Sequence, residues 1–171
     1  MSNCRNDVPE FNDIGCNIEL SDIRAFALVD ETVVITDPTD PDDWDAGAYE
    51  ANILIFSESS GSYTASVTEV SSKGRQDMRT AGIKHEATIR LDGLKLNNEF
   101  ADVLNKADNY RLYAVLGVDH NTLLHSIANV SINMVAMIPE GTDQIADWQL
   151  MVKWSYPSNP EFTAVPTGIF V

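Results

Sequence analysis

Histidines, cysteines and aspartates are the residues of this sequence whose side chains are best suited to chemistry. The three histidines, His85, His120 and His125, form no H-x-x-x-H or H-E-x-x-H pair, so the helical zinc motifs are absent from the sequence. Cys4 and Cys16 lack the second pair of ligands that a tetrahedral zinc site needs. We therefore expect neither a metal ion nor a cofactor.

An aspartate-rich segment, residues 37–47, offers the hard oxygen ligands that Ca²⁺ prefers. Its candidate ligands are Asp40, Asp42, Asp43 and Asp45. Trp44 stands where an EF-hand loop would carry an acidic residue, and the prolines and glycine predict a segment without regular structure. We interpret it as a solvated acidic loop, in which like charges repel one another, and not as a metal site.

Motifs of nucleophilic or phosphoryl-transfer enzymes are also absent. Gly74 and Gly82 have the wrong spacing for a phosphate-binding loop, and no G-x-S-x-G sequence occurs. His120 follows Asp119, an acid that could orient it as a base, but no nucleophile is evident for it to activate. The sequence predicts a protein that is not an enzyme; a small β-barrel enzyme with a His/Asp site assembled in space is the weaker alternative.

The charge of the chain is strongly negative and unevenly distributed. Its 171 residues contain 26 acidic and 11 basic side chains, a net charge of −15. Such a surface disfavours binding to the phosphate backbone of nucleic acids and to anionic membranes. Residues 1–70 hold 15 acidic and 2 basic groups, whereas residues 71–95 hold 6 basic and 3 acidic ones. This opposition of charge is suited to head-to-tail self-association, although two solvated loops of opposite sign would produce the same pattern.

Alternation of apolar and polar residues with period two dominates the chain and predicts an all-β fold. With 44% hydrophobic residues the chain can bury a real core, and no apolar run approaches the 20 or so residues of a membrane-spanning helix. No apolar leader follows Met1, so we expect synthesis in the cytoplasm. The predicted elements are about eight strands of a β-sandwich or open barrel, at residues 23–29, 32–35, 49–56, 63–68, 83–91, 110–118, 123–137 and 148–156.

Helical periodicity is convincing in one segment, residues 97–107. Its apolar stripe consists of Leu96, Phe100, Val103, Leu104 and Ala107. A single helix in a β domain usually closes one open end of the sandwich or barrel. The segment 71–82 is polar, basic and bracketed by glycines, which predicts a long loop between two strands.

The order of these elements resembles that of the tail tube proteins of tailed bacteriophages and of tube-like proteins of contractile injection systems. The resemblance covers nearly the whole chain at the level of architecture, without a specific signature. It implies a single domain, residues 1–171, with an N-terminal arm at 1–16. Residues 161–171 depart from the family's pattern; because they are apolar and show no strand pattern, we expect residues 157–171 to form an arm that docks on a neighbouring subunit. The segments that carry it are residues 64–68, 71–82, 83–91, 98–107, 110–118, 123–137 and 146–156.

If the resemblance holds, the chain is a virion protein whose rings, commonly hexameric, stack into a tube or a head–tail connector through which DNA passes. Its partners are then further copies of itself and adjacent tail or connector proteins. The basic loop would contact the acidic loop of the next ring, and aromatic residues of the last strand would face a neighbouring subunit or the core. The residues so implied are Lys73, Arg75, Arg79 and Lys84 for stacking, Asp40, Asp42, Asp43 and Asp45 as their partners, and Trp148, Trp154 and Tyr156 at the subunit face.

A non-catalytic binding module is the competing hypothesis, of the capsid-decoration or adhesin type. The aspartate-rich segment and the Ser/Thr alternation at residues 57–72 support it. Stabilisation by Ca²⁺ would favour this module, whereas salt-sensitive ring formation would favour the tube.

Overall fold

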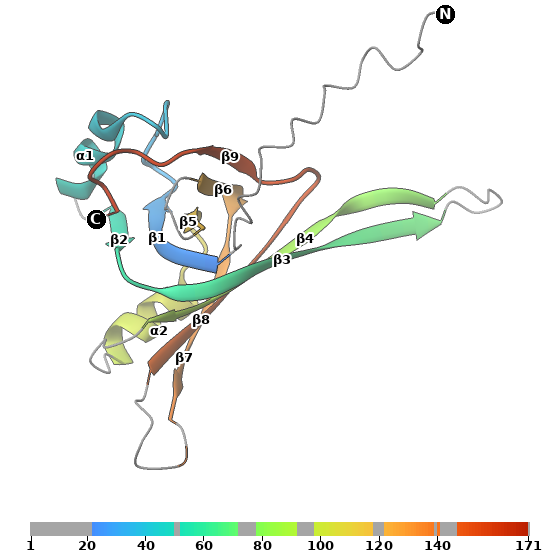
Figure 1. The fold of residues 1–171 in the computed structure, drawn as a ribbon. Coiled ribbons are helices and arrows are strands. Elements are labelled where there is room, and N and C mark those ends of the chain that lie inside the picture. The colour runs from blue at the N-terminus through green and yellow to red at the C-terminus, as the bar shows by residue number, and fades with distance from the viewer. Residues whose placement is uncertain are drawn as a thin grey trace, which may run out of the picture.

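Nine strands form one antiparallel sheet in the computed structural model, which describes residues 22–49, 52–71, 78–91, 98–117, 122–138, 140 and 147–170 (Figure 1). The strand order is β7-β8-β4-β3-β1-β5-β6-β9, and β2 pairs with β1 beside β3. This confirms the all-β prediction, together with its one amphipathic helix, α2. The elements are β1 (Asp22–Asp30), α1 (Pro41–Tyr49), β2 (Ile53–Phe56), β3 (Ser60–Ser71), β4 (Met78–Leu91), α2 (Asn98–Lys106), β5 (Tyr110–Leu116), β6 (Thr122–Asn129), β7 (Ser131–Met137), β8 (Asp147–Tyr156) and β9 (Glu161–Ala164).

The predicted alternation is clearest in β4 and β8, which lie side by side in the sheet. Ala87 pairs with Val152 and Ile89 pairs with Leu150, and all four side chains are buried. The intervening residues of β4 are exposed or half-buried. Helix α2 places Leu104 into the same core, so this helix covers one end of the sheet as expected.

The predicted strand at 123–137 is wrong as a single element, because the chain divides it at Val130 into β6 and β7. β6 pairs with β5 and β9, whereas β7 pairs with β8 at the opposite edge of the sheet. Ile127 has a positive φ of 64°, a conformation that a β-branched residue rarely adopts. The Ser126 hydroxyl accepts the Leu112 N–H and donates to the Ala128 carbonyl, which satisfies backbone groups where the ladder is interrupted. The turn at Val130 carries the chain from one edge of the sheet to the other, so that the sheet wraps around its main core.

Residues 37–47, predicted as an irregular acidic loop, contain helix α1 instead. Pro41 occupies the first helical turn, where proline is tolerated, and the Asp40 carboxylate accepts the N–H of Asp42 as a cap. Trp44 is fully buried on this helix and anchors it to the sheet. The prolines and aspartates thus mark the start of a helix.

Two further predicted strands differ from the structure near this helix. Residues 32–35 are not a strand. Glu31 and Thr32 form a turn, because the Asp30 carboxylate accepts both the N–H and the hydroxyl of Thr32 and ends β1. Those hydrogen bonds hold the pKa of Asp30 below its ordinary value. Of the predicted strand 49–56 only Ile53–Phe56 is a strand, since Tyr49 ends the helix.

The C-terminal segment, predicted as an arm without its own strand, folds back onto its own sheet. β9 pairs with β6, and Phe170 is buried beside Trp44 in a second core cluster. Phe170 is therefore buried within the same chain, whereas Phe162 of β9 is exposed. The predicted N-terminal arm, residues 1–16, lies outside the described residues.

The predicted loop at 71–82 is shorter than expected. Ser71 is the last residue of β3, and Met78–Leu91 is the next strand, with Thr68 paired to Gly82 and Ser71 paired to Met78. Cross-strand pairing therefore extends into the segment that its polarity and glycines assigned to a loop. Residues 72–77 lie outside the described part of the chain.

Candidate functional site

The hairpin of β3 and β4 projects from the body of the molecule as a two-stranded arm (Figure 1). β8 accompanies β4 only as far as the pair Ile83↔Tyr156, and β1 pairs with β3 only at Asp22 and Ile23. Among the described residues the outer parts of β3 and β4 thus pair only with each other. An isolated two-stranded ribbon is marginally stable in water. The arm consequently has unpaired backbone groups along β3 that another surface could satisfy.

The face of the sheet that packs in the core stays apolar along this arm, past the last buried residues. Ala65 and Val67 lie on the same face of β3 as Tyr63, and the Val67 side chain is 56% exposed. Ile83 and Tyr156, beside them, are half-buried. A continuous apolar strip on a projecting ribbon is typical of a surface that contacts another protein.

Three stacked rings close the core at the base of the arm. His85 and Trp154 stack with 5.0 Å between ring centroids, and Tyr63 stacks on both. The Tyr63 hydroxyl and His85 Nδ1 are 2.6 Å apart and share a hydrogen bond. Burial lowers the pKa of His85 and raises that of Tyr63. These groups hold the arm to the body of the sheet.

This stack corrects the predicted subunit-face role of the tryptophans. Trp148 and Trp154 are only 4% and 5% exposed and belong to the main core of the same chain. Tyr156 is half-buried at the margin of that core, beside the arm. Of the three predicted aromatics, only Tyr156 is partly exposed at the surface of this chain.

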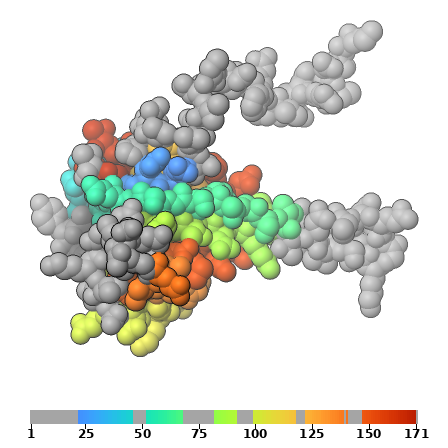
Figure 2. All heavy atoms as spheres, turned by 60° about the horizontal axis from the view of Figure 1, so that its bottom comes forward, coloured from blue at the N-terminus to red at the C-terminus, as the bar shows by residue number. Residues whose placement is uncertain are grey.

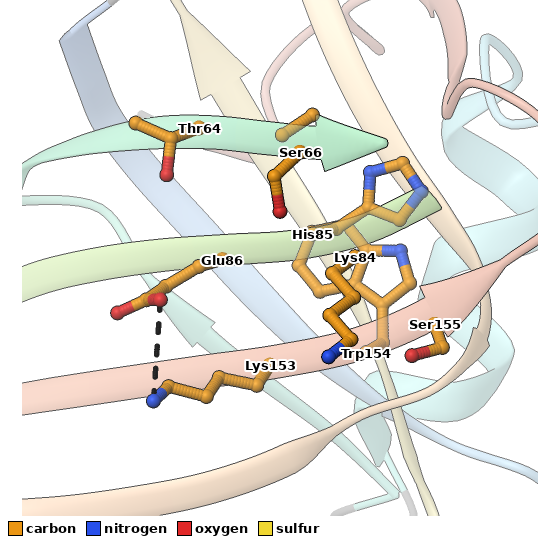
Figure 3. Close-up of a pocket in the computed structure, with 9 residues that line it drawn as sticks. Thr64, Ser66, Lys84, His85, Glu86, Lys153, Trp154 and Ser155 are labelled. Carbon is orange, nitrogen blue, oxygen red and sulfur yellow. Dashed lines mark ion pairs between the residues drawn. The ribbon is translucent and has the colours of Figure 1, made fainter. Parts of the chain in front are cut away.

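A polar groove of about 600 Å³ lies across β3, β4 and β8, and its lining includes His85 and Trp154 of the ring stack (Figure 3). Glu86 and Lys153 form an ion pair at 3.9 Å across it. Lys84 lies on the same face and forms no ion pair with another described residue. The groove is also lined by the hydroxyl side chains of Thr64, Ser66 and Ser155.

The four basic residues predicted for stacking do not share one loop. Lys84 is exposed within β4 on the groove face, and Arg79 also belongs to β4, opposite Val70. Lys73 and Arg75 lie outside the described residues. The prediction of a single stacking loop is therefore corrected: two of its residues are in a strand, because β4 begins at Met78.

The predicted acidic partners gather at the start of α1. The Asp43 carboxylate accepts the N–H of Asp37, and that of Asp40 caps the helix, so both are engaged by local backbone groups. Asp42 and Asp45 are exposed. Helix α1 and the β3–β4 arm lie at opposite ends of the molecule in both overall views (Figures 1 and 2). Within one chain, helix α1 and the described part of the arm therefore do not meet.

Metal ligation is not supported at this acidic segment. Within the described ranges no cluster of three or more His, Cys, Asp or Glu side chains is arranged to hold a metal ion. The same ranges contain no helix long and apolar enough to cross a membrane.

Asn105 is a functional side chain that no sequence motif revealed. It lies on α2, and its amide group both donates to the Met134 carbonyl and accepts the Met134 N–H, at 3.2 and 2.6 Å. The amide thus imitates a neighbouring strand along the edge of β7. Covering an edge in this way prevents it from pairing with another chain.

We expect Asn105→Ala to lower the free energy of unfolding by about 1–3 kcal/mol, because two backbone groups of β7 lose their partner. Urea denaturation followed by circular dichroism measures this change. Asp102→Ala, at an exposed position of the same helix, is the matched control and should change stability by less than about 0.5 kcal/mol. Equal midpoints for the two variants would show that the amide does not protect the edge.

Comparisons of this chain with protein-family models, with curated proteins and with solved structures found no match.

Proposed function

We propose that this chain is a structural subunit that associates head to tail into rings, as in a phage tail tube or head–tail connector through which DNA passes. The proposal rests on the positions of two different surfaces, the β3–β4 arm and helix α1. The β3–β4 arm projects at one end of the subunit, and the acidic helix α1 lies at the other. A contact between different surfaces of identical subunits generates a closed ring or a continuing stack.

Charge complementarity supports the same arrangement. Residues 71–95, which include the outer part of the arm, hold 6 basic and 3 acidic side chains. Helix α1 exposes Asp42 and Asp45 and follows a segment that is itself acidic. Opposite potentials on two surfaces steer their encounter and set their register.

The composition is also compatible with a passage for DNA. With a net charge of −15, a ring of such subunits would repel the phosphate backbone and would not retain DNA in transit. In this proposal the protein resides in the virion and its partners are further copies and adjacent tail or connector proteins. It performs no catalysis and needs no cofactor.

A binding module of the capsid-decoration or adhesin type is the second candidate, and the polar groove favours it. The hydroxyls of Thr64, Ser66 and Ser155, together with Lys84, offer several hydrogen-bond donors on one concave surface. A groove of about 600 Å³ falls within the usual range for small-molecule sites.

The ionic strength of the buffer distinguishes the two candidates. We expect assemblies formed at about 0.05 M salt to dissociate at about 0.5 M, because screening then reduces the Debye length to a few ångströms. Static light scattering at fixed protein concentration measures this dissociation. If salt has no effect and added Ca²⁺ instead raises the melting temperature, the binding module replaces the ring subunit as the favoured function.

A further inference from the structure

His125 is a buried titratable side chain that the proposed assembly does not use. It lies in β6 directly opposite Glu161 of β9, and its side chain is 11% exposed. The Tyr113 ring stacks on it with 4.1 Å between centroids and a 10° angle between planes. Glu161 Oε2 is 3.6 Å from His125 Nδ1, beyond hydrogen-bond distance.

The surroundings of His125 suit a neutral imidazole and penalise a charged one. Both ring nitrogens are buried without a hydrogen bond to the described residues, and the Tyr113 hydroxyl is buried in the same way. Among the described groups, the charges that act on the ring are Arg111 on β5 and Glu161 on β9. Arg111 repels a protonated ring from within the sheet, whereas the attracting carboxylate is 63% exposed and screened by water.

The strand that covers His125 is weakly attached. β9 has four residues and pairs only with β6 among the described strands. Its Phe162 side chain is 54% exposed and therefore contributes little buried area. Beyond β9, Phe170 packs edge-on against Trp44, and Val165 and Ile169 pack against the same core cluster.

We propose that His125 is an acid-sensitive latch, and that its protonation releases β9 and the C-terminal segment from the sheet. Release lets the imidazolium reach water and uncovers the β6 edge from Thr122 to His125. A newly opened strand edge can pair with another chain. Acidification would thereby create a surface that is covered at neutral pH.

The direction of the pH effect follows from the two states of the ring. Burial, reinforced by Arg111 and opposed by Glu161, lowers the pKa of His125 to about 4 in the closed state. In the released state the pKa returns to about 6.5. The closed state is thus fully favoured above pH 6.5 and is progressively lost as the pH falls toward 4. At pH 5 the ratio of closed to released molecules should be about 20-fold lower than at pH 7.

Hydrogen exchange measured by mass spectrometry on the full chain tests the latch. After correction for the intrinsic pH dependence of exchange, amides of β9 should lose protection between pH 7 and pH 5. Amides of β1, which contains no histidine, serve as the internal control and should remain protected. His125→Phe keeps an aromatic ring against Tyr113 without a titrating group, and we expect it to abolish the pH dependence at β9.

Glu161→Gln supplies a second, independent readout. Removing the carboxylate makes the imidazolium less favourable in the closed state, so β9 should open further at pH 5 than in the unchanged protein. Two results would overturn the latch. One is acid-induced exchange at β9 that persists in His125→Phe, and the other is loss of protection at β9 only together with β1.

Discussion

Replacement of Trp44 by alanine is expected to lower the free energy of unfolding by about 3–5 kcal/mol. The indole is completely buried, and it packs edge-on against Tyr113 at 4.9 Å and Phe170 at 5.4 Å. Its Nε1–H donates to the Pro38 carbonyl at 3.0 Å. The substitution therefore removes the contact by which α1 and the C-terminal segment are held to the second core cluster. A loss of this size is a large fraction of the 5–15 kcal/mol typical of a domain.

Urea denaturation of three variants separates the causes of this loss. Trp44→Phe keeps an aromatic ring but lacks the hydrogen bond to Pro38, and it should cost less than Trp44→Ala. Asp45→Ala changes the next residue, which is exposed, and should alter stability by less than about 0.5 kcal/mol. If Trp44→Ala cost less than about 1 kcal/mol, α1 would not be anchored in the way that its burial indicates.

The strands and the helix with regular periodicity could be predicted because local pattern and tertiary environment agree there. In β4 the alternation from His85 to Leu91 matches the buried and exposed faces, and in α2 the predicted stripe contains the buried Leu104. Such elements contain, within a few consecutive residues, the pattern that determines which face is buried.

Helix α1 could not be predicted in this way, because its stability depends on distant residues. Its prolines and aspartates are typical of loops, and the helix is only 9 residues long. The burial of Trp44 depends on Tyr113 and Phe170, which reach it from other parts of the chain. The break at Val130 could not be predicted either. It lies within an apolar run, and it places β7 at the opposite edge of the sheet from β6 and β9.

Only part of the candidate site could be predicted from the sequence, because the rest depends on contacts between distant residues. The charges on α1 and around residues 71–95 are visible in the sequence, but the length of the arm depends on cross-strand pairs such as Thr68 with Gly82. The tryptophans of β8 share one face, as the alternation predicts, and only the fold reveals that this face is the core. The role of Asn105 depends on a single contact between α2 and β7, for which the sequence carries no signal.

Shortening the arm should abolish assembly while leaving the subunit folded. Replacing residues 72–77 by Asn-Gly would connect Ser71 and Met78, the last described pair of the ladder, by a tight two-residue turn. We expect a monomer whose urea midpoint is unchanged, because the replacement retains every strand pair that the structure describes. Lys73→Gln/Arg75→Gln, with the loop at its full length, separates the loss of charge from the loss of length. Undiminished assembly of the shortened protein would show that assembly does not require the full length of the arm.

Mass photometry at rising protein concentration, with negative-stain images of the same samples, measures whether the protein associates with itself. We expect rings with a central hole, or stacks of them, for the unchanged protein at low salt, and single subunits for the shortened one. A strict monomer at every concentration would contradict the ring proposal and would favour the binding module.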